Sequence, residues 1–178
     1  MNPGDLEELI RGLVRDVPDY PSPGILFKDI TPLLADAAAF AAIVDALVEQ
    51  HAPGSIDKVV GIEARGFILA APVAYHLNAG FVPMRKKGKL PYQTFENSYA
   101  LEYASATIEV HRDAFAPGDR VLIVDDVLAT GGTALAALDL VSQAGGTAVG
   151  LSFLLELKAL PGREALAGAG PIHSLYIV

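Results

Sequence analysis

Hydrophobic residues follow two alternating patterns along the chain, one typical of strands and the other of helices. Continuous apolar runs with the length of strands buried on both faces occupy residues 58–62, 80–84, 121–124, 148–157 and 172–178. Apolar residues at helical spacing predict helices over residues 5–16, 36–50, 67–78 and 133–144, the first with Asp5 as its N-cap. Strands that alternate with helices in this way predict an α/β protein built on an open sheet.

Two segments interrupt this alternation. Residues 17–34 contain four prolines and are too stiff and too poor in donors for a helix or a central strand. Such a segment either packs on the surface or presents its backbone N–H and C=O groups to a ligand, and the pattern leaves both interpretations open. Residues 99–110 alternate with a period of two, which predicts a hairpin, and the residues before them lack a core pattern, as expected of a mobile flap.

Composition narrows the class of protein. The chain has 178 residues, of which 52% are hydrophobic and 19% charged, as expected of one compact domain with its own core. A net charge of −8 disfavours nucleic acid as a partner, and the absence of cysteine excludes disulfides and thiolate metal sites. The four histidines show no metal-ligand spacing. The acidic N-terminus does not resemble a signal peptide, and no apolar stretch is long enough to span a membrane, so we expect a cytoplasmic protein.

The most informative stretch is VLIVDDVLATGGT, residues 121–133. An apolar strand is followed by Asp125 and Asp126, then by a turn of small residues, then by the start of a helix. Such a turn leaves backbone N–H groups accessible at the positive end of a helix, where a phosphate is favoured. Carboxylates repel phosphate, so their presence indicates a ligand with a diol near its phosphate, as in ribose 5-phosphate. Alternatively, the two acids cap the strand or hold Mg²⁺ in a phosphotransfer site.

Positive charge is concentrated at the ends of two other predicted strands. Arg65 follows the strand at 58–62, within the turn Glu63-Ala64-Arg65-Gly66, and the basic segment RKKGK occupies residues 85–89. The carboxyl ends of strands in an open α/β sheet are where ligands bind. We therefore interpret both segments as anion-binding, although a basic turn that is simply solvated remains an alternative for residues 85–89.

Taken together, these segments resemble a known family. VLIVDDVLATGGT resembles the phosphoribosyl pyrophosphate (PRPP) signature of the type I phosphoribosyltransferases. YPSPGILFKDITPLL, GIEARGF, RKKGKLP, SYALEY and LLELKALPGRE resemble successive segments of the members that act on adenine, so the resemblance covers essentially the whole chain. It implies a single domain over residues 1–178 with a mostly parallel central sheet flanked by helices, a base-recognition hood at about 1–34, and a basic loop with a flexible flap at about 85–109.

The resemblance also implies an activity, the transfer of the 5-phosphoribosyl group from PRPP to N9 of adenine, giving AMP and pyrophosphate in purine salvage. The residues that it assigns to the 5′-phosphate are Ala129, Thr130, Gly131, Gly132 and Thr133, and those that it assigns to the ribose hydroxyls are Asp125 and Asp126. It assigns pyrophosphate to Arg65, Arg85, Lys86 and Lys89, and it implies a cis peptide at Glu63-Ala64.

For the base, the resemblance assigns adenine to Leu26, Phe27, Lys28 and Leu157. The backbone groups of Leu26 and the N–H of Lys28 would meet the ring edge, and Phe27 and Leu157 would sandwich the ring. Lys28 stands where many members carry arginine, a difference that a main-chain contact tolerates. Glu102 is implied in proton transfer near N7, with Tyr103 beside it, although Glu102 is otherwise interpreted as an exposed hairpin residue.

The resemblance further implies Mg²⁺ as the PRPP complex, without a direct protein ligand, and a homodimer with neither nucleic acid nor membrane as a partner. Two other functions remain open. The same fold could use guanine, hypoxanthine or xanthine, although the YPSPGILFKD segment favours adenine. It could also serve a non-catalytic regulator that senses PRPP or binds RNA, which the acidic charge and the Glu102 segment disfavour.

Overall fold

The computed structural model describes residues 2–100 and 105–178. The chain divides into two compact units, residues 1–46 and 47–178, and each is described by itself. The expectation of a single domain therefore stays a prediction.

The first unit contains helices together with a two-stranded sheet, and the sequence did not predict the sheet. Its elements are α1 (Pro3–Leu13), β1 (Arg15–Pro18), β2 (Leu26–Asp29), α2 (Thr31–Ala35) and the first part of α3 (Ala37–Glu49). Strands β1 and β2 are antiparallel, with Val17 opposite Phe27 and Pro18 opposite Leu26. Proline, which has no N–H, is tolerated here because both strands are edge strands.

Two acidic residues lie at the starts of helices in this unit. Asp5 was predicted as the N-cap of α1, and this prediction was wrong, because the helix begins at Pro3 and the Oδ1 of Asn2 accepts the Asp5 N–H at 2.9 Å. Proline suits the first helical position, where an N–H would have no partner. Asp36, in contrast, does precede α3, and its Oδ1 accepts the Ala39 N–H at 2.9 Å.

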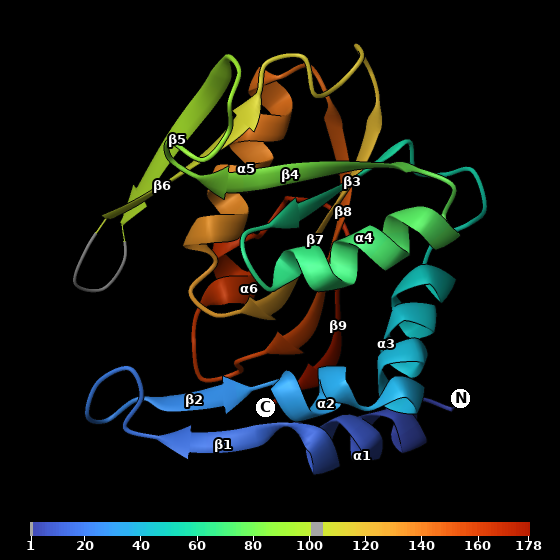
Figure 1. Ribbon diagram of the computed structural model, residues 1–178, viewed down its shortest axis with the longest axis vertical. Coiled ribbons are helices and arrows are strands. Elements are labelled where there is room, and N and C mark those ends of the chain that lie inside the picture. Colours follow the sequence, from blue (N-terminus) through green and yellow to red (C-terminus); the bar gives the residue numbers. More distant parts are fainter. Residues whose placement is uncertain (1, 101–104) are drawn as a thin grey trace. The chain divides into compact units, whose positions relative to one another are not determined.

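The second unit is organised around a seven-stranded sheet in the order β5-β6-β4-β3-β7-β8-β9 (Figure 1). The strands are β3 (Lys58–Ile62), β4 (Gly80–Lys86), β5 (Thr94–Ala100), β6 (Ser105–His111), β7 (Arg120–Leu128), β8 (Thr147–Glu156) and β9 (Ile172–Ile177). In this order, β4, β3, β7, β8 and β9 each pair parallel with the next strand. Strand β6 pairs antiparallel with both β4 and β5. The predicted mostly parallel central sheet is confirmed.

Helices α4 (Gly66–His76) and α5 (Gly132–Gln143) make the crossovers β3-α4-β4 and β7-α5-β8. The two crossovers run in opposite directions along the sheet, and because such connections are right-handed, the helices cover opposite faces. Helix α4 packs on β3, β4 and β7, and α5 packs on β5 to β8 without β3 or β4 among its main partners (Figure 1). The strand order therefore reverses between β3 and β7, and the carboxyl ends of strands at such a point form a ligand crevice.

Two boundaries differ from the sequence-based predictions. Strand β7 was predicted to end at Val124, but it continues to Leu128 because its pairing with β8 extends to Leu128 opposite Glu156. Residues 94–98 lie before the predicted hairpin and were expected to lack regular structure, but they form β5 together with residues 99–100 because this strand pairs along its full length with β6. Among the described residues, no helix is both long and apolar enough to cross a lipid bilayer.

The hydrophobic core of the second unit includes β7, β8 and the inner face of α5. Shortening a side chain in this core should therefore leave a cavity and lower the stability of the protein. Leu140 on α5 is fully buried in this core, whereas Leu135 on the same helix is 44% exposed. We expect Leu140→Ala to lower the free energy of unfolding by about 2–5 kcal/mol, through lost burial and the cavity left behind. Leu135→Ala, with the same change in helix propensity, should change it by less than about 1 kcal/mol. Urea unfolding of both variants measures the difference, and equal losses would contradict the assignment of the core.

Candidate active site

Asp125 and Asp126 lie at the point where the strand order reverses. The pairing of β3 with β7 ends at Gly61 opposite Val124, whereas β7 continues to pair with β8 on its other side. The two carboxylates therefore lie on the part of β7 that is paired with β8 but no longer with β3. Their backbone is held by β8, while their side chains are placed beside the turn that follows β3.

That turn brings Arg65 to the acidic pair. The Nε of Arg65 lies 2.8 Å from the Oδ2 of Asp126, whose residue is only 6% exposed. The N–H of Asp126 donates a hydrogen bond of 2.9 Å to the Oδ1 of Asp125. The peptide between Glu63 and Ala64 is cis, as the resemblance implied. Three residues selected from two separate sequence motifs are thus gathered in one site.

The electrostatics of this site are dominated by its burial. Burial raises the pKa of the Asp125 carboxyl well above its usual range, and the Asp126 carboxylate raises it further, while the Arg65 guanidinium opposes both effects. If both adjacent acids are ionised, their two negative charges face only the one positive charge of Arg65 described above. Hydroxyl groups that donate to these oxygens would favour the charged form.

Gly66 allows the turn to approach the acids so closely. A Cβ at this position would lie 2.7 Å from the Oδ1 of Asp125 and 3.1 Å from the carbonyl oxygen of Val124. Helix α4 begins at Gly66, with Arg65 as its N-cap, so a larger residue would push the start of the helix away from β7. The glycine thereby determines the position of Arg65 next to Asp126.

Residues 129–133, called the 129–133 loop below, run from the end of β7 into the first two residues of α5, and they border a pocket of about 130 Å³. Of the five residues predicted to bind phosphate, Ala129, Thr130, Gly131 and Thr133 line the pocket together with Asp125, while Gly132 begins α5. Gly131 is the N-cap residue of α5 and has a φ of 87°, a left-handed conformation that favours glycine. The pocket thus combines a carboxyl group with the N-terminus of a twelve-residue helix.

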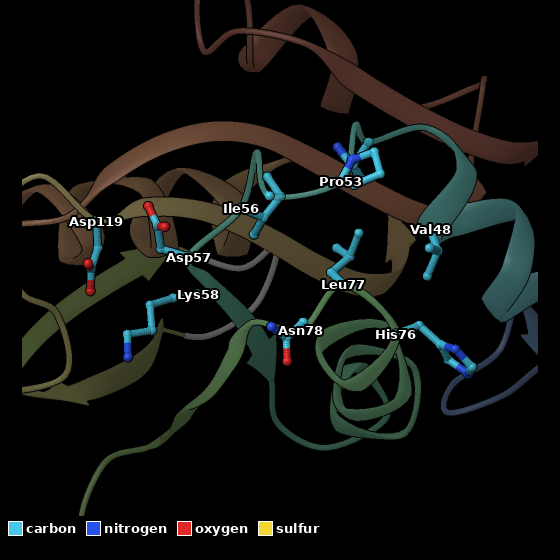
Figure 2. Close-up of a pocket in the computed structure, with 11 residues that line it drawn as sticks. Val48, Pro53, Ile56, Asp57, Lys58, His76, Leu77, Asn78 and Asp119 are labelled. Atoms are coloured by element: carbon cyan, nitrogen blue, oxygen red, sulfur yellow. The ribbon is translucent and has the colours of Figure 1, made fainter.

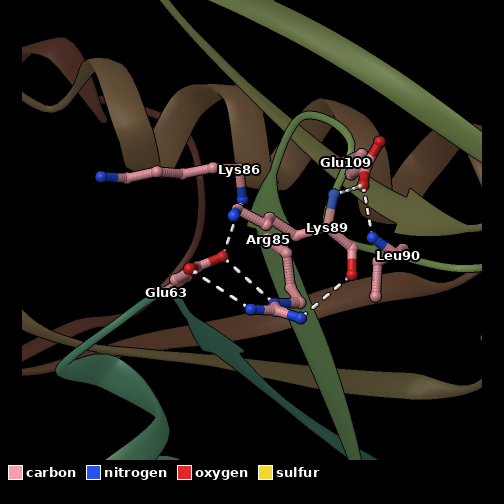
Figure 3. A network of polar contacts seen from close by, with 6 residues as sticks. All are labelled: Glu63, Arg85, Lys86, Lys89, Leu90 and Glu109. Atoms are coloured by element: carbon pink, nitrogen blue, oxygen red, sulfur yellow. Dashed lines mark hydrogen bonds and ion pairs between the residues drawn. The ribbon is translucent and has the colours of Figure 1, made fainter.

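The basic segment is fixed by two buried or half-buried glutamates that the sequence analysis missed (Figure 3). The Nε of Arg85 donates to the Oε2 of Glu63 at 3.2 Å, and the same oxygen accepts the backbone N–H of Lys86 at 3.0 Å. Burial raises the pKa of Glu63, but the Lys86 N–H and the Arg85 guanidinium outweigh it, so the pKa lies below its usual value. The side chain of Lys86 extends away from Glu63 (Figure 3).

Glu109 holds the other end of the segment. It is 3% exposed, and its Oε1 accepts the backbone N–H groups of Lys89 and Leu90 at 3.0 and 2.8 Å (Figure 3). The Nη1 of Arg85 in turn donates to the carbonyl oxygen of Lys89 at 3.0 Å. A glutamate between the buried residues Ile108 and Val110 was the signal in the sequence, because a carboxylate among core positions needs a partner.

The remaining predicted residues are placed as follows. In the first unit, Leu26 is exposed, the ring centroid of Phe27 lies 5.1 Å from that of Tyr20, and the Nζ of Lys28 lies 2.7 Å from the Oδ1 of Asp16. In the second unit, Leu157 follows β8, and its N–H donates to the carbonyl oxygen of Leu128 at 2.9 Å. Glu102 and Tyr103 lie outside the described residues.

A larger cavity, of about 550 Å³, lies at the opposite edge of the same sheet (Figure 2). It is lined in part by Asp57, Lys58 and Asp119, at the amino ends of β3 and β7. None of the predicted site residues lines it, and parallel sheets bind ligands at their carboxyl ends. Neither edge carries a metal cluster, since no group of three or more histidine, aspartate or glutamate residues among the described residues is arranged to hold an ion.

Comparisons with known proteins show the family to which the chain belongs. Residues 28–164 match the phosphoribosyl transferase domain, the class that the fold and the site define. The adenine phosphoribosyltransferase of Acidothermus cellulolyticus is 74% identical over 178 residues, the full length of both chains. The crystal structure of adenine phosphoribosyltransferase from Rhodothermus marinus has a TM-score of 0.93 at 54% identity, covering 98% of this chain and 99% of that one.

A second similar structure contains ligands. The adenine phosphoribosyltransferase of Saccharomyces cerevisiae, complexed with an imino-altritol bisphosphate and adenine, has a TM-score of 0.90 at 38% identity, covering 97% of this chain and 99% of that one. This chain belongs to the adenine phosphoribosyltransferase family.

Proposed function

We propose that the protein transfers the 5-phosphoribosyl group from PRPP to adenine, giving AMP and pyrophosphate, at the crevice between β3 and β7. The observation that carries this proposal is the union of three groups in one place. Asp125 lines a pocket with the 129–133 loop, and the adjacent Asp126 forms an ion pair with Arg65. That set matches the diol, the pyrophosphate and the 5′-phosphate of PRPP.

The ribose and its phosphate are assigned to the two sides of this crevice. The 129–133 loop receives the 5′-phosphate, where backbone N–H groups and the N-terminus of α5 favour an anion. Asp125 and Asp126 accept hydrogen bonds from the ribose 2′ and 3′ hydroxyls. These bonds would add donors to a pair of acids that shares the Arg65 cation, which supports the pairing of this site with a diol.

The leaving group is assigned to the cationic side. Cleavage of the bond between C1′ and oxygen leaves negative charge on pyrophosphate, and cations placed there in advance stabilise it. Arg65 contacts Asp126 through Nε, one of five guanidinium donors, and Arg85, Lys86 and Lys89 extend the positive charge. Mg²⁺ enters with PRPP as part of the substrate and neutralises phosphate charge when bound.

The resemblance assigns adenine to Leu26, Phe27, Lys28 and Leu157, and the backbone of β2 supports the part of this assignment that lies in the first unit. Leu26 lies opposite Pro18, which has no N–H to donate, so this pair cannot exchange both of its hydrogen bonds. In an antiparallel pair, the backbone groups of alternate residues point to the same edge, so those of Leu26 and Lys28 share one edge of β2. That arrangement supports a backbone that reads the edge of a base. Phe27 and Leu157 would contact its faces, with Glu102 and Tyr103 acting near N7.

The test of the proposed function is the formation of AMP. Purified protein supplied with adenine, PRPP and Mg²⁺ should release pyrophosphate and form AMP, and excess EDTA should abolish the reaction. Hypoxanthine in place of adenine should give at least about 100-fold lower kcat/KM, because the donor and acceptor pattern of the base is reversed. Turnover of hypoxanthine alone would contradict the adenine assignment, and binding of PRPP without release of pyrophosphate would favour a regulator.

We further propose that the protein is a homodimer that buries the outer face of α4. Tyr75 is 81% exposed, and Ile68 and Ala71 lie on the same helix at intervals of three and four residues. An apolar stripe of this kind marks a protein interface. Sedimentation velocity should give a dimer for the wild type and a monomer for Tyr75→Glu, whereas a monomeric wild type would reject the proposal. The expected cytoplasmic location stays a prediction.

A further inference from the structure

The short helix α6 (Gly162–Ala165) is in direct backbone contact with the 129–133 loop. A Cβ at Gly162 would lie 2.2 Å from the carbonyl oxygen of Ala129, and a Cβ at Gly131 would lie 3.0 Å from the carbonyl oxygen of Gly162. These distances leave no room for a side chain on either residue. Any displacement of α6 therefore changes the space available to the loop.

Arg163 connects this helix to the ends of two strands. Its Nε donates to the Oε1 of Glu156 at 2.8 Å, and its Nη2 donates to the Oε2 of the same carboxylate at 2.5 Å. Glu156 is buried at the end of β8, and Ser174 on β9 donates to its Oε2 at 2.7 Å. The Nη1 of Arg163 also donates to the carbonyl oxygen of Ile172, at 3.3 Å. A bidentate pair of this kind fixes orientation as well as distance.

Apolar packing into the core holds α6 at its C-terminal end. Leu166, directly after the helix, is buried in the core of the second unit. Arg163 and Glu164 of α6 instead border a cavity of about 590 Å³. The contacts of Arg163 with Glu156 and Ile172 are thus the polar connection that keeps the start of α6 against the loop.

We propose that Arg163 and Glu156 are positioning residues that hold α6 against the 129–133 loop and thereby set the affinity for the 5′-phosphate of PRPP. Neither residue contacts the substrate. This inference rests on the proposed function, in which that loop binds the 5′-phosphate. Loss of the pair would let α6 move into the space beside it and the loop relax, so the backbone N–H groups would no longer converge on one phosphate.

The test compares Arg163→Met with a matched variant at the other end of β7. Arg120 makes an equivalent bidentate pair with Asp57, at 2.9 Å to each oxygen, at the amino end of this strand. Both Arg163→Met and Arg120→Met should lower the melting temperature. Only Arg163→Met should raise the Kd for ribose 5-phosphate and the KM for PRPP, each by about tenfold, since small displacements of a binding loop are costly. Its KM for adenine should change less than its KM for PRPP.

Conservative variants keep the inference falsifiable. Arg163→Lys retains the charge without the bidentate geometry and should bind ribose 5-phosphate with intermediate affinity, and Glu156→Gln should weaken binding in the same direction. Isothermal titration calorimetry with ribose 5-phosphate measures the Kd of each variant, and if Arg163→Met does not fold, the Kd of Arg163→Lys decides. Equal Kd values for wild type, Arg163→Lys and Glu156→Gln would overturn the inference, as would equal losses in Arg120→Met. A wild type that binds ribose 5-phosphate without forming AMP would contradict only the proposed function.

Discussion

Replacing Asp126 by alanine is expected to lower kcat/KM for PRPP by about 10- to 150-fold while leaving the protein folded. A hydrogen bond to a charged group is worth about 1.5–3 kcal/mol, and each 1.4 kcal/mol corresponds to about a factor of ten. Asp126 is buried, so a carboxylate here accepts ribose hydroxyls without competition from water. Its partner Arg65 retains solvent access, with a side chain 36% exposed, so its charge is not stranded in the variant.

Steady-state kinetics and a thermal melt of Asp126→Ala decide the matter together. Asp113→Ala is the matched control, because Asp113 is an exposed acid in the turn after β6. It should match the wild type in both measurements. If Asp126→Ala loses stability but keeps kcat/KM, Asp126 would serve only as the ion-pair partner of Arg65, and the assignment of the ribose hydroxyls would fail.

The sequence predicted the parallel strands because burial on both faces leaves a continuous apolar run. Strand β3, with four of its five residues buried, is an example. It could not predict how far each strand continues, because pairing can outlast the apolar pattern. Strand β7 carries Asp125 and Asp126 within it, since β8 provides hydrogen bonds up to Leu128. Strands β1 and β2 were missed for the related reason that their pairing does not depend on an apolar face.

The candidate site was predictable where its residues are adjacent in sequence. Asp125, Asp126 and the 129–133 loop form one motif, and Asp125 lines one pocket with four residues of that loop, although both acids lie within β7 rather than after it. The residues that were missed act across the fold. Glu63 holds Arg85, which is 22 positions away, and Glu109 holds the backbone of Lys89, which is 20 positions away. The place of Glu109 between core residues signals that it needs a partner but not which one, so only the register of the sheet reveals these contacts.

The same reasoning explains Glu156 and Arg163. Both occur in LLELKALPGRE, a segment that was recognised only for Leu157. Their importance depends on Gly162, whose contact with the carbonyl oxygen of Ala129 no sequence pattern reveals. The proposed sites of substrate contact are therefore easier to identify in the sequence than the network that we propose to position them.

Asp125→Asn should separate activity from stability, lowering the first and raising the second. Asparagine retains an oxygen that can accept the Asp126 N–H, so the local structure should persist. It loses the charge, and because charge-assisted hydrogen bonds are about twice as strong as neutral ones, kcat/KM should fall by about tenfold or more. Kinetics with adenine and PRPP at neutral pH measure this loss.

The gain in stability should depend on pH in a defined direction. The pKa of Asp125 is raised in the folded protein, by burial first and by Asp126 second, so the unfolded chain loses this proton more readily. Below the unfolded pKa of about 3.9, both states are protonated and the group does not affect stability. As pH rises from there through the folded pKa, ionisation increasingly favours the unfolded state.

Asparagine does not titrate, so the unfolding free energy of Asp125→Asn minus that of the wild type should increase with pH and then level off. Urea unfolding without ligand, from about pH 4 to pH 8, measures this difference, with Asp113→Asn as an exposed control that should show little change. Saturating PRPP should reverse the order of stability, because the wild type binds the ribose more tightly. A difference that stays constant across this range would mean that the pKa of Asp125 is not raised in the folded protein. Any difference in stability between the two proteins would then not come from the ionisation of Asp125.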